Sequence, residues 1–274
     1  MGYALRQTFR YAVVVVVLGI VIVPFLWIFL ASFLPNSELI TRTPTFSLDN
    51  LTLSNYQNLQ QAAKYFTYLR NSAVVALTST VVSITLAMLA AYSVYRTRYP
   101  GRRSLYLALI ITYVFPGVVL LIPLYQLMGK VGLINSLMSL VIVNVTFTAP
   151  FSVWLMRGFF GAIPAGIEEA AAIDGAGRMR ILFSIVLPLT APGVAAAAIF
   201  SFVWSWTEYM FASAFIVDEG KKTLPVGLGA FIQQYNIDWG ILTAAAVATA
   251  VPVIVIFAFI GRYFVEGLTA GAEK

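Results

Sequence analysis

The sequence predicts an all-α integral membrane protein with six transmembrane helices and a cytoplasmic helix–turn–helix between the fourth and the fifth. Of the 274 residues, 60% are hydrophobic and 10% are charged, and the mean hydropathy is +0.88. Soluble domains have about 45–50% apolar and about 25% charged residues, so this chain is too apolar for water. The chain also has six apolar stretches of membrane length, and a charged segment, 161–189, separates two of them.

Each predicted span reaches the length of about 20 apolar residues that crosses the hydrocarbon core. The first span follows Arg6 and Arg10, as the apolar region of a signal peptide would. It is too long for that region and no small-residue cleavage site follows it, so we predict an uncleaved span. The chain shows no convincing internal repeat, and we predict one transmembrane domain over 1–274. The spans are 11–34, 71–95, 104–128, 131–156, 190–217 and 239–261.

Basic residues predict the orientation of the spans, because cytoplasmic loops carry an excess of Lys and Arg. With successive loops on opposite sides, 11 of the 17 basic residues fall on one side and 6 on the other. We therefore expect both termini and the 157–190 loop in the cytoplasm, and the 35–70 and 218–238 loops outside. The first group is Arg6, Arg10, Arg96, Arg98, Arg102, Arg103, Arg157, Arg178, Arg180, Arg262 and Lys274; the second is Arg42, Lys64, Arg70, Lys130, Lys221 and Lys222.

Composition also excludes several classes of function. The chain has no Cys and no His, which excludes disulfides, thiolate nucleophiles, Ser-His dyads and imidazole metal sites. The four Asp residues lie in predicted loops, so a membrane-embedded aspartate dyad is excluded as well. The high pI of about 9.5 is explained by the basic residues that flank the spans and does not indicate nucleic acid binding.

The charged segment 161–189 predicts a pair of short helices. Pro164 suits the first position of a helix, and Glu168 and Glu169 near that end suit the helix dipole. Alanines propagate the helix, and Gly175 suits the left-handed position that follows a helix. This first helix has about three turns.

A second helix is predicted to follow, with one apolar stripe and an end at Pro188. Pro192 would then open the fifth span. The pair could lie at the membrane surface as an amphipathic hairpin that only connects two spans. The alanines beside the two glutamates give a face of little bulk, which favours insertion into a cleft on another protein. The stripe is Met179, Leu182, Phe183 and Val186, spaced i, i+3, i+4 and i+7.

The same segment resembles the EAA motif of the permease subunits of ATP-binding-cassette (ABC) importers. The motif runs Glu169-Ala170-Ala171, three residues, Gly175, nine residues, Ile185, one residue, Leu187-Pro188. The chain resembles in particular the carbohydrate branch of that family, of MalG type, in several further stretches. These are LSNYQNL (53–59), NSAVVA (71–76), AAYSVYRTRYPGRRSL (90–105), IPLYQLMGKVGLINS (122–136), LPVGL (224–228) and GRYFVEGLTAGAEK (261–274).

The resemblance implies that the first short helix is the coupling helix, seated in a groove of a cytoplasmic ATPase. It implies as partners a second, MalF-like permease, two ATPase subunits, an extracytoplasmic sugar-binding protein and membrane lipid. ATP and Mg would be bound by the ATPase subunits, because this chain has no phosphate-binding loop motif and is not itself an enzyme. The implied location is the inner membrane of a bacterial or archaeal cell. The ATPase-coupling residues would be Glu168, Glu169, Ala170, Ala171, Asp174, Gly175, Ile185 and Pro188.

Glu208 and its aromatic neighbours are candidates for a substrate path. A carboxylate inside a span is costly and suggests a functional site. Trp204, Trp206 and Tyr209 could offer flat faces to sugar rings while Glu208 accepts bonds from hydroxyls. Alternatively, Glu208 reaches water or accepts from a partner helix near the outer end of the span, and the aromatic residues form an interfacial belt.

Two further groups could line the path. Pro116, Gly117 and Pro123 in the third span could break the helix beside a cavity or form an ordinary kink. Asn144 in the fourth span could line the path or bond to a neighbouring helix.

We predict a permease subunit that forms half of the pore of an ATP-driven sugar importer. The alternatives are an ABC importer permease for a solute other than a sugar, a self-sufficient secondary transporter or channel, and an intramembrane enzyme. A self-sufficient transporter usually has several ionisable groups in its spans, whereas here only Glu208 lies in one. It would also leave the helix pair at 161–189 without a role.

Overall fold

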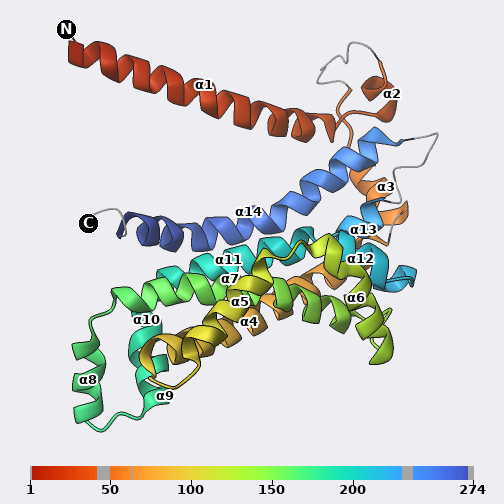
Figure 1. The fold of residues 1–274 in the computed structure, drawn as a ribbon. Coiled ribbons are helices and arrows are strands. Elements are labelled where there is room, and N and C mark those ends of the chain that lie inside the picture. The colour runs from red at the N-terminus through yellow and green to blue at the C-terminus, as the bar shows by residue number, and fades with distance from the viewer. Residues whose placement is uncertain (1, 42–49, 63, 230–236, 271–274) are drawn as a thin grey trace. The chain divides into compact units, whose positions relative to one another are not determined.

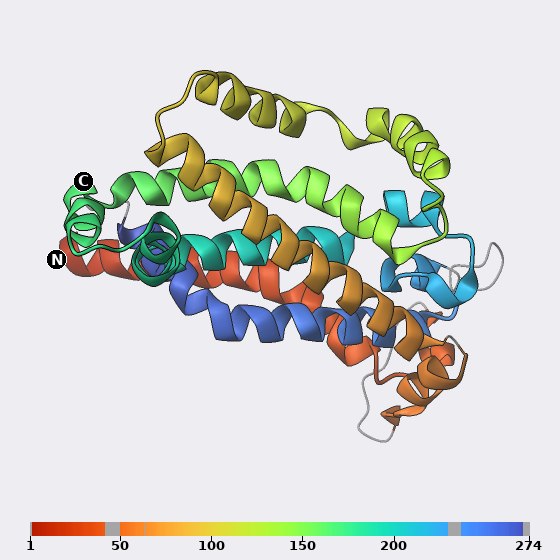
Figure 2. The same ribbon diagram turned by 90° about the horizontal axis from the view of Figure 1, so that it is seen from below.

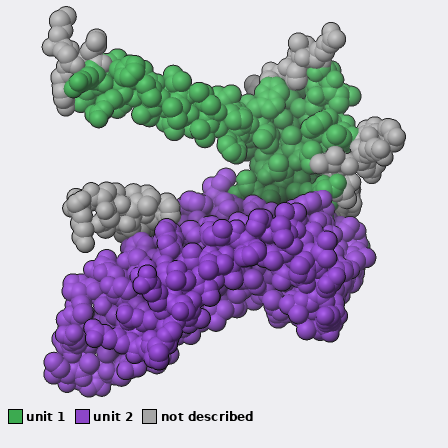
Figure 3. Space-filling model, viewed as in Figure 1, with its two compact units in different colours: residues 1–65, 227–252 green, residues 66–226, 253–274 purple. Residues whose placement is uncertain are grey.

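The protein is all-helical in the computed structural model, which describes residues 2–41, 50–62, 64–229 and 237–270 (Figure 1). Arg42 and Lys274, which were used to predict the orientation, and the last residues of the motif at 261–274 lie outside the described residues. The chain divides into two compact units, 1–65 with 227–252 and 66–226 with 253–274 (Figure 3).

Four helices are long and apolar enough to cross a membrane: α1 (Gly2–Ala31), α4 (Tyr65–Arg96), α7 (Leu137–Ala162) and α14 (Trp239–Ala270). Each exceeds the roughly 20 residues needed for a hydrocarbon core about 30 Å thick. Two bent pairs also pass this test, so the described residues hold up to six spans if each pair counts as one. The pairs are Arg102–Val114 with Gly117–Lys130, bent by 103°, and Arg178–Leu189 with Ala191–Thr207, bent by 82°.

The predicted third span, 104–128, is not one continuous helix. It consists of α5 (Arg102–Val114) and α6 (Gly117–Lys130), which are separated at Phe115 and Pro116. Phe115 is extended, with φ −68° and ψ 128°, because the ring of a following proline disfavours the helical conformation. Pro123 lies inside α6 and does not end it.

The predicted fourth span, 131–156, begins too early. Residues 131–136 form a turn in which Gly132 and Asn135 have positive φ, at 70° and 60°. The helix α7 starts only after Ser136, whose side chain accepts a hydrogen bond from the Met138 amide as an N-cap. The pattern of apolar residues does not reveal this later start of the helix, because it carries no information about backbone φ angles.

The predicted fifth span, 190–217, is also interrupted. It contains α11 (Ala191–Thr207) and the short helix α12 (Met210–Phe215), with Glu208 extended between them. A loop with the single turn η3 (Glu219–Lys221) then leads to α13 (Leu224–Gly229).

The core of unit 2 is built around α7. This helix runs alongside α11 in both views and also packs against α5 and α12 (Figures 1 and 2). Around Phe147, its first half joins Phe211 and Phe215 of α12 in one apolar cluster. Around Met156 and Phe160, its second half joins α4 and the 161–189 segment in another.

Buried hydroxyl groups add hydrogen bonds between these helices. The Ser83 hydroxyl of α4 lies 2.6 Å from the Thr148 hydroxyl of α7, and Ser152 of α7 lies 3.3 Å from Ser201 of α11. Such bonds stabilise helix pairs in membranes, where lipid removes the hydrophobic drive for association.

Unit 1 contains α1, α2 (Asn36–Leu39) and α3 (Ser54–Ala62), together with the first part of α14. The side-chain amide of Asn55 in α3 donates hydrogen bonds to the carbonyls of Ser32 and Leu34, at 2.9 and 2.7 Å. These bonds satisfy backbone carbonyls just after the end of α1. The Trp239 amide at the start of α14 donates to the Asn36 side chain.

Gly193 lets α11 approach α7, which gives the first prediction. A Cβ at this position would lie 2.5 Å from ring atoms of Phe159. Gly193→Ala should therefore destabilise the protein by about 1–3 kcal/mol through overpacking. Thermal unfolding in detergent measures the change. Gly19→Ala in α1 is the matched control, because no atom lies within 4 Å of the Cβ it adds; equal melting temperatures for the two variants would contradict the prediction.

Candidate functional site

The first helix of the 161–189 segment is α8 (Ala165–Ile173), and its end is formed as the sequence predicts. Gly175 has φ +84° and its amide donates to Ala172, while the Ala176 amide donates to Ala171. These two bonds form a Schellman motif, which requires a left-handed residue at the glycine. Pro164 is the N-cap and not the first helical residue, so the helix begins one position later than expected.

The second helix differs from the predicted one in its buried face. It consists of α9 (Arg178–Ile181), a π-helical turn over Leu182–Val186 and α10 (Leu187–Leu189). The Leu187 amide reaches the Leu182 carbonyl across the wider turn, and the next residue, Pro188, has no N–H to donate. The helix runs one residue past Pro188, the predicted end.

Only two of the four residues of the predicted apolar stripe are buried. Leu182 and Val186 are buried as predicted, with Ile181 beside them. Met179 and Phe183 are instead 58% and 45% exposed. The buried face therefore follows Ile181, Leu182 and Val186, and the π turn lets Ile181 and Val186, five residues apart, lie on the same face.

The predicted coupling residues on α8 form an exposed surface. Glu169, Ala170, Asp174 and Gly175 are exposed and Ala171 is partly buried. Ile173 beside them is 86% exposed, an unusual position for a large apolar side chain. On the second helix Pro188 is exposed and Ile185 is partly buried. This surface offers small side chains, carboxylates and one apolar residue to a partner.

Glu168 points away from this exposed surface. Its Oε1 lies 2.7 Å from Nε of Arg96, the last residue of α4, and its Oε2 accepts a hydrogen bond of 3.1 Å from the Tyr92 hydroxyl. The Arg96 N–H does not point along the line to the oxygen, so the contact is a close ion pair and not an aligned hydrogen bond. Both oxygens of Glu168 are thus held by α4.

Arg96 also bonds to the end of α7, a contact that sequence reasoning missed. Its Nη2 donates to the carbonyls of Phe160 and Ile163 at 3.2 and 2.8 Å. The sequence offered Arg96 only as one of several basic residues that indicate orientation. A single arginine at the end of a long apolar helix could have suggested bonds to helix-terminal carbonyls, but not which helix supplied them.

Five of the seven candidate substrate-path residues line one cavity of about 680 Å³ in unit 2. It lies at the two helix breaks, between α5 and α6 and between α11 and α12. Trp206 and Asn144 do not line it, because each is only 2% exposed and packed in the core. The five are Pro116, Gly117, Trp204, Glu208 and Tyr209.

Aromatic side chains form much of the cavity wall. Trp204 is 40% exposed and stacks on Phe147 with ring centroids 6.2 Å apart, while Tyr209 is 53% exposed. Tyr113 and Phe115 at the end of α5 also line the cavity and were not predicted. Trp206 stacks on Phe202 inside unit 2 instead.

The side chain of Glu208 caps the N-terminal end of α12. Its Oε1 accepts from the Phe211 amide at 2.7 Å, and its Oε2 accepts from the Ala212 amide at 2.9 Å. The first amides of a helix have no partner within the helix, and here both are satisfied by one carboxylate. The sequence left open whether Glu208 binds substrate, reaches water or accepts from a partner helix. The structure shows an arrangement that was not considered: Glu208 accepts from backbone amides of its own chain and also lines the cavity.

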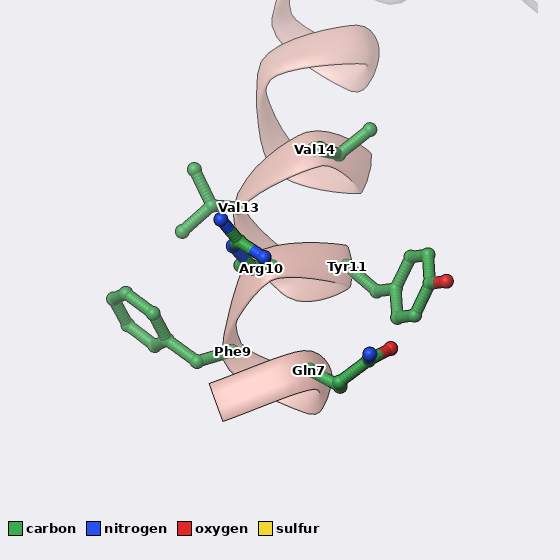
Figure 4. Close-up of a pocket in the computed structure, with 6 residues that line it drawn as sticks. All are labelled: Gln7, Phe9, Arg10, Tyr11, Val13 and Val14. Atoms are coloured by element: carbon green, nitrogen blue, oxygen red, sulfur yellow. The ribbon is translucent and has the colours of Figure 1, made fainter. Parts of the chain in front are cut away.

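Two other features of the chain do not form a binding site. Within the described residues, no group of three or more Asp and Glu side chains could hold a metal ion. A hollow on α1 is lined by side chains from two turns of one helix that point away from one another, so it is helix surface and does not enclose a ligand (Figure 4). Its residues are Gln7, Phe9, Arg10, Tyr11, Val13 and Val14.

Comparisons with known proteins identify the family. The model of the family "Binding-protein-dependent transport system inner membrane component" matches residues 83–269. The inner membrane ABC transporter permease protein YcjP of Escherichia coli (strain K12) is 35% identical over 257 residues, which cover 93% of this chain and 92% of that protein. The trehalose/maltose transport system permease protein MalG of Thermococcus litoralis is 34% identical over 259 residues, covering 92% and 91%.

The fold is likewise similar to that of a chain in a solved ABC transporter structure. A chain in the crystal structure of a bacterial ABC transporter involved in the import of the acidic polysaccharide alginate superposes with a TM-score of 0.84 at 22% identity, covering 96% of this chain and 98% of that one. This protein belongs to the family of binding-protein-dependent transport system inner membrane components.

Proposed function

We propose that this chain is the permease subunit of an ATP-driven, binding-protein-dependent sugar importer, in which it forms half of the translocation pore. The observation that carries the proposal is the exposed surface of α8, with Glu169, Ala170 and Gly175 of the EAA motif on one capped helix. Membership of the family supports it, and so does the similarity to a trehalose/maltose permease.

In this proposal α8 is the coupling helix and rests in a groove of an ATPase subunit. Small side chains at Ala170 and Gly175 allow close approach of the two surfaces, while Glu169, Asp174 and Ile173 supply charge and an apolar contact. Two ATPase subunits bind ATP and Mg, and their closure moves α8. This chain carries out no chemistry of its own. Ile185 and Pro188 shape the helix that connects α8 to α11.

The proposed topology is a single transmembrane domain over 1–274 with six spans and both termini in the cytoplasm. Here α5 with α6 makes the third span and α11 with α12 the fifth, both broken, while Arg178–Leu189 stays on the cytoplasmic side of its 82° bend with α11. Broken helices in a membrane are tolerated where they are buried in protein or line a water-filled cavity. A second, MalF-like permease would supply the other half of the pore, and an extracytoplasmic binding protein would deliver the sugar.

The cavity at the two helix breaks is proposed as part of the sugar path. Its exposed aromatic faces at Trp204 and Tyr209 suit the C–H faces of sugar rings, and its polar groups suit hydroxyls. None of the thirteen residues that line it is Lys or Arg, so this half of the path offers no cation to an acidic sugar. We therefore propose neutral glycosides as the transported class.

The proposal is tested first by identifying the partners. The tagged chain, extracted from its native membrane in mild detergent, should co-purify with an ATPase that has a phosphate-binding loop and with a second permease that has an EAA motif. Glu169→Ala combined with Gly175→Leu should release the ATPase. If the chain instead purifies alone or as a homo-oligomer and transports a solute by itself, it is a secondary transporter.

Gly175→Leu should uncouple ATP hydrolysis from uptake without unfolding the protein. A side chain at φ +84° costs about 1–2 kcal/mol and adds bulk to the proposed docking surface. Gly132→Leu is the matched control, because Gly132 also has a positive φ and open space, yet lies in the turn between α6 and α7. Both variants should express, and only Gly175→Leu should lose uptake in proteoliposomes; normal uptake by Gly175→Leu would contradict the coupling role.

The cavity can be probed with single cysteines, because the chain has none of its own. Thr207 lines the cavity, whereas Ser205, two residues earlier on α11, is 6% exposed. In the assembled transporter, Thr207→Cys should react several-fold faster than Ser205→Cys with a charged methanethiosulfonate reagent, which needs a hydrated thiolate. The transported sugar should slow the reaction at Thr207→Cys. A reaction at Thr207→Cys as slow as that at the buried Ser205→Cys would contradict a water-filled cavity.

A further inference from the structure

The contact between Arg96 and Glu168 joins α8 to the long helices of unit 2. We propose that these two residues are a positioning pair, which fixes the direction of α8 and transmits its displacement to α4 and α7. The inference rests on the proposed role of α8 as the coupling helix and goes beyond it, because it states how motion of α8 reaches the spans.

Three helix ends meet at this pair. Arg96 is the last residue of α4, and its Nη2 donates to the carbonyls of Phe160 and Ile163 at the end of α7. Glu168 lies in the first turn of α8. Cations are favoured at the C-terminal ends of helices and anions at the N-terminal ends, so each charge sits where the helix dipoles stabilise it. One guanidinium therefore connects all three helices.

The carboxylate of Glu168 is held at two points. Arg96 approaches Oε1 and the Tyr92 hydroxyl donates to Oε2, at 2.7 and 3.1 Å. Tyr92 and Arg96 are four residues apart on α4 and so lie on one face of that helix. A carboxylate held by two contacts rotates less freely than one held by a single contact. The direction of α8 is therefore also more restricted.

Apart from the two residues that join it to α7, Ile163 and Pro164, α8 has few other contacts with the long helices. None of its residues is buried, although Ala171 packs partly against the apolar cluster around Phe160. By contrast, the side chains of Arg96 and Glu168 are only 16% and 12% exposed. Removing one partner of a charge pair with so little access to water leaves the other charge uncompensated. The pair is thus a large part of the side-chain contact between α8 and the long helices, beside the short link through Ile163 and Pro164.

The two adjacent glutamates of α8 have different environments. Glu168 faces α4, whereas Glu169 is exposed. Successive residues of an α-helix point about 100° apart, so one turn can present one carboxylate to the spans and the next to a partner. In the proposed mechanism Glu169 belongs to the surface that receives the motion and Glu168 to the contact that passes it on.

The test uses the complete transporter in proteoliposomes, with sugar uptake and ATP hydrolysis measured in the same vesicles. Arg96→Gln and Glu168→Gln should each lower uptake per ATP hydrolysed about 5-fold or more, the size of an ordinary coupling energy. The double variant should lose no more uptake per ATP than the more affected single variant, because both changes remove the same contact between Arg96 and Glu168. Arg98→Gln is the matched control: Arg98 is exposed two residues further on, and the ratio should stay unchanged.

A purely structural role would lower the amount of assembled complex and leave the ratio of uptake to hydrolysis unchanged. Glu168→Gln keeps the size of the side chain and an acceptor for Tyr92, so it disturbs folding least. Arg96→Lys keeps the charge and should recover part of the ratio. A normal ratio of uptake to hydrolysis in assembled Glu168→Gln and Arg96→Gln complexes, or additive losses in the double variant, would contradict the role of the two residues as a positioning pair.

The outcome for Gly175→Leu separates this inference from the function on which it rests. If Gly175→Leu uncouples the transporter while the Arg96 and Glu168 variants do not, the positioning pair is wrong and the coupling helix stands. If Gly175→Leu also leaves uptake per ATP unchanged, α8 is not the coupling helix, and the positioning pair is overturned with it.

Discussion

The arrangement of this protein depends on satisfying the backbone groups that helix ends expose. The N–H and C=O groups at a helix end have no partner within the helix, and each one left unbonded away from water costs several kcal/mol. Arg96 bonds to the last carbonyls of α7, and Glu208 accepts from the first amides of α12. Asn135 accepts from the amides of Val217 and Asp218 after α12. Single polar side chains therefore determine where the apolar helices stop and which ends meet.

This constraint places polar residues at positions that also suit transport. The end of α4, the end of α7 and the start of α8 meet at one ion pair with little solvent exposure, while the rest of α8 remains exposed. A short helix that is held at its first turn and exposed along its outer face can transmit a displacement as a rigid unit. The same segment would be a poor lever if it were joined to the spans by a flexible linker.

The helical class, the presence of several long apolar helices and the capped end of α8 were predictable, because they depend on composition, on the length of apolar runs and on the need for glycine at positive φ. The broken third span was anticipated at Pro116 as one of two possibilities. The late start of α7 and the π turn at Leu182 were not predictable, since both depend on local hydrogen bonding that leaves the apolar pattern unchanged. The pairing of Arg96 with Glu168 was hidden for another reason: the two residues are far apart in sequence.

The position of Glu208 shows why a charge within an apolar stretch is ambiguous in sequence but informative in structure. A helix break exposes amides that require an acceptor, and it also leaves space that neighbouring helices do not fill. The acceptor and the cavity therefore occur together, as they do at Glu208 and the cavity beside it. Capping the helix and lining the proposed sugar path are thus compatible roles for this carboxylate, because the same break in the helix requires the cap and creates the cavity.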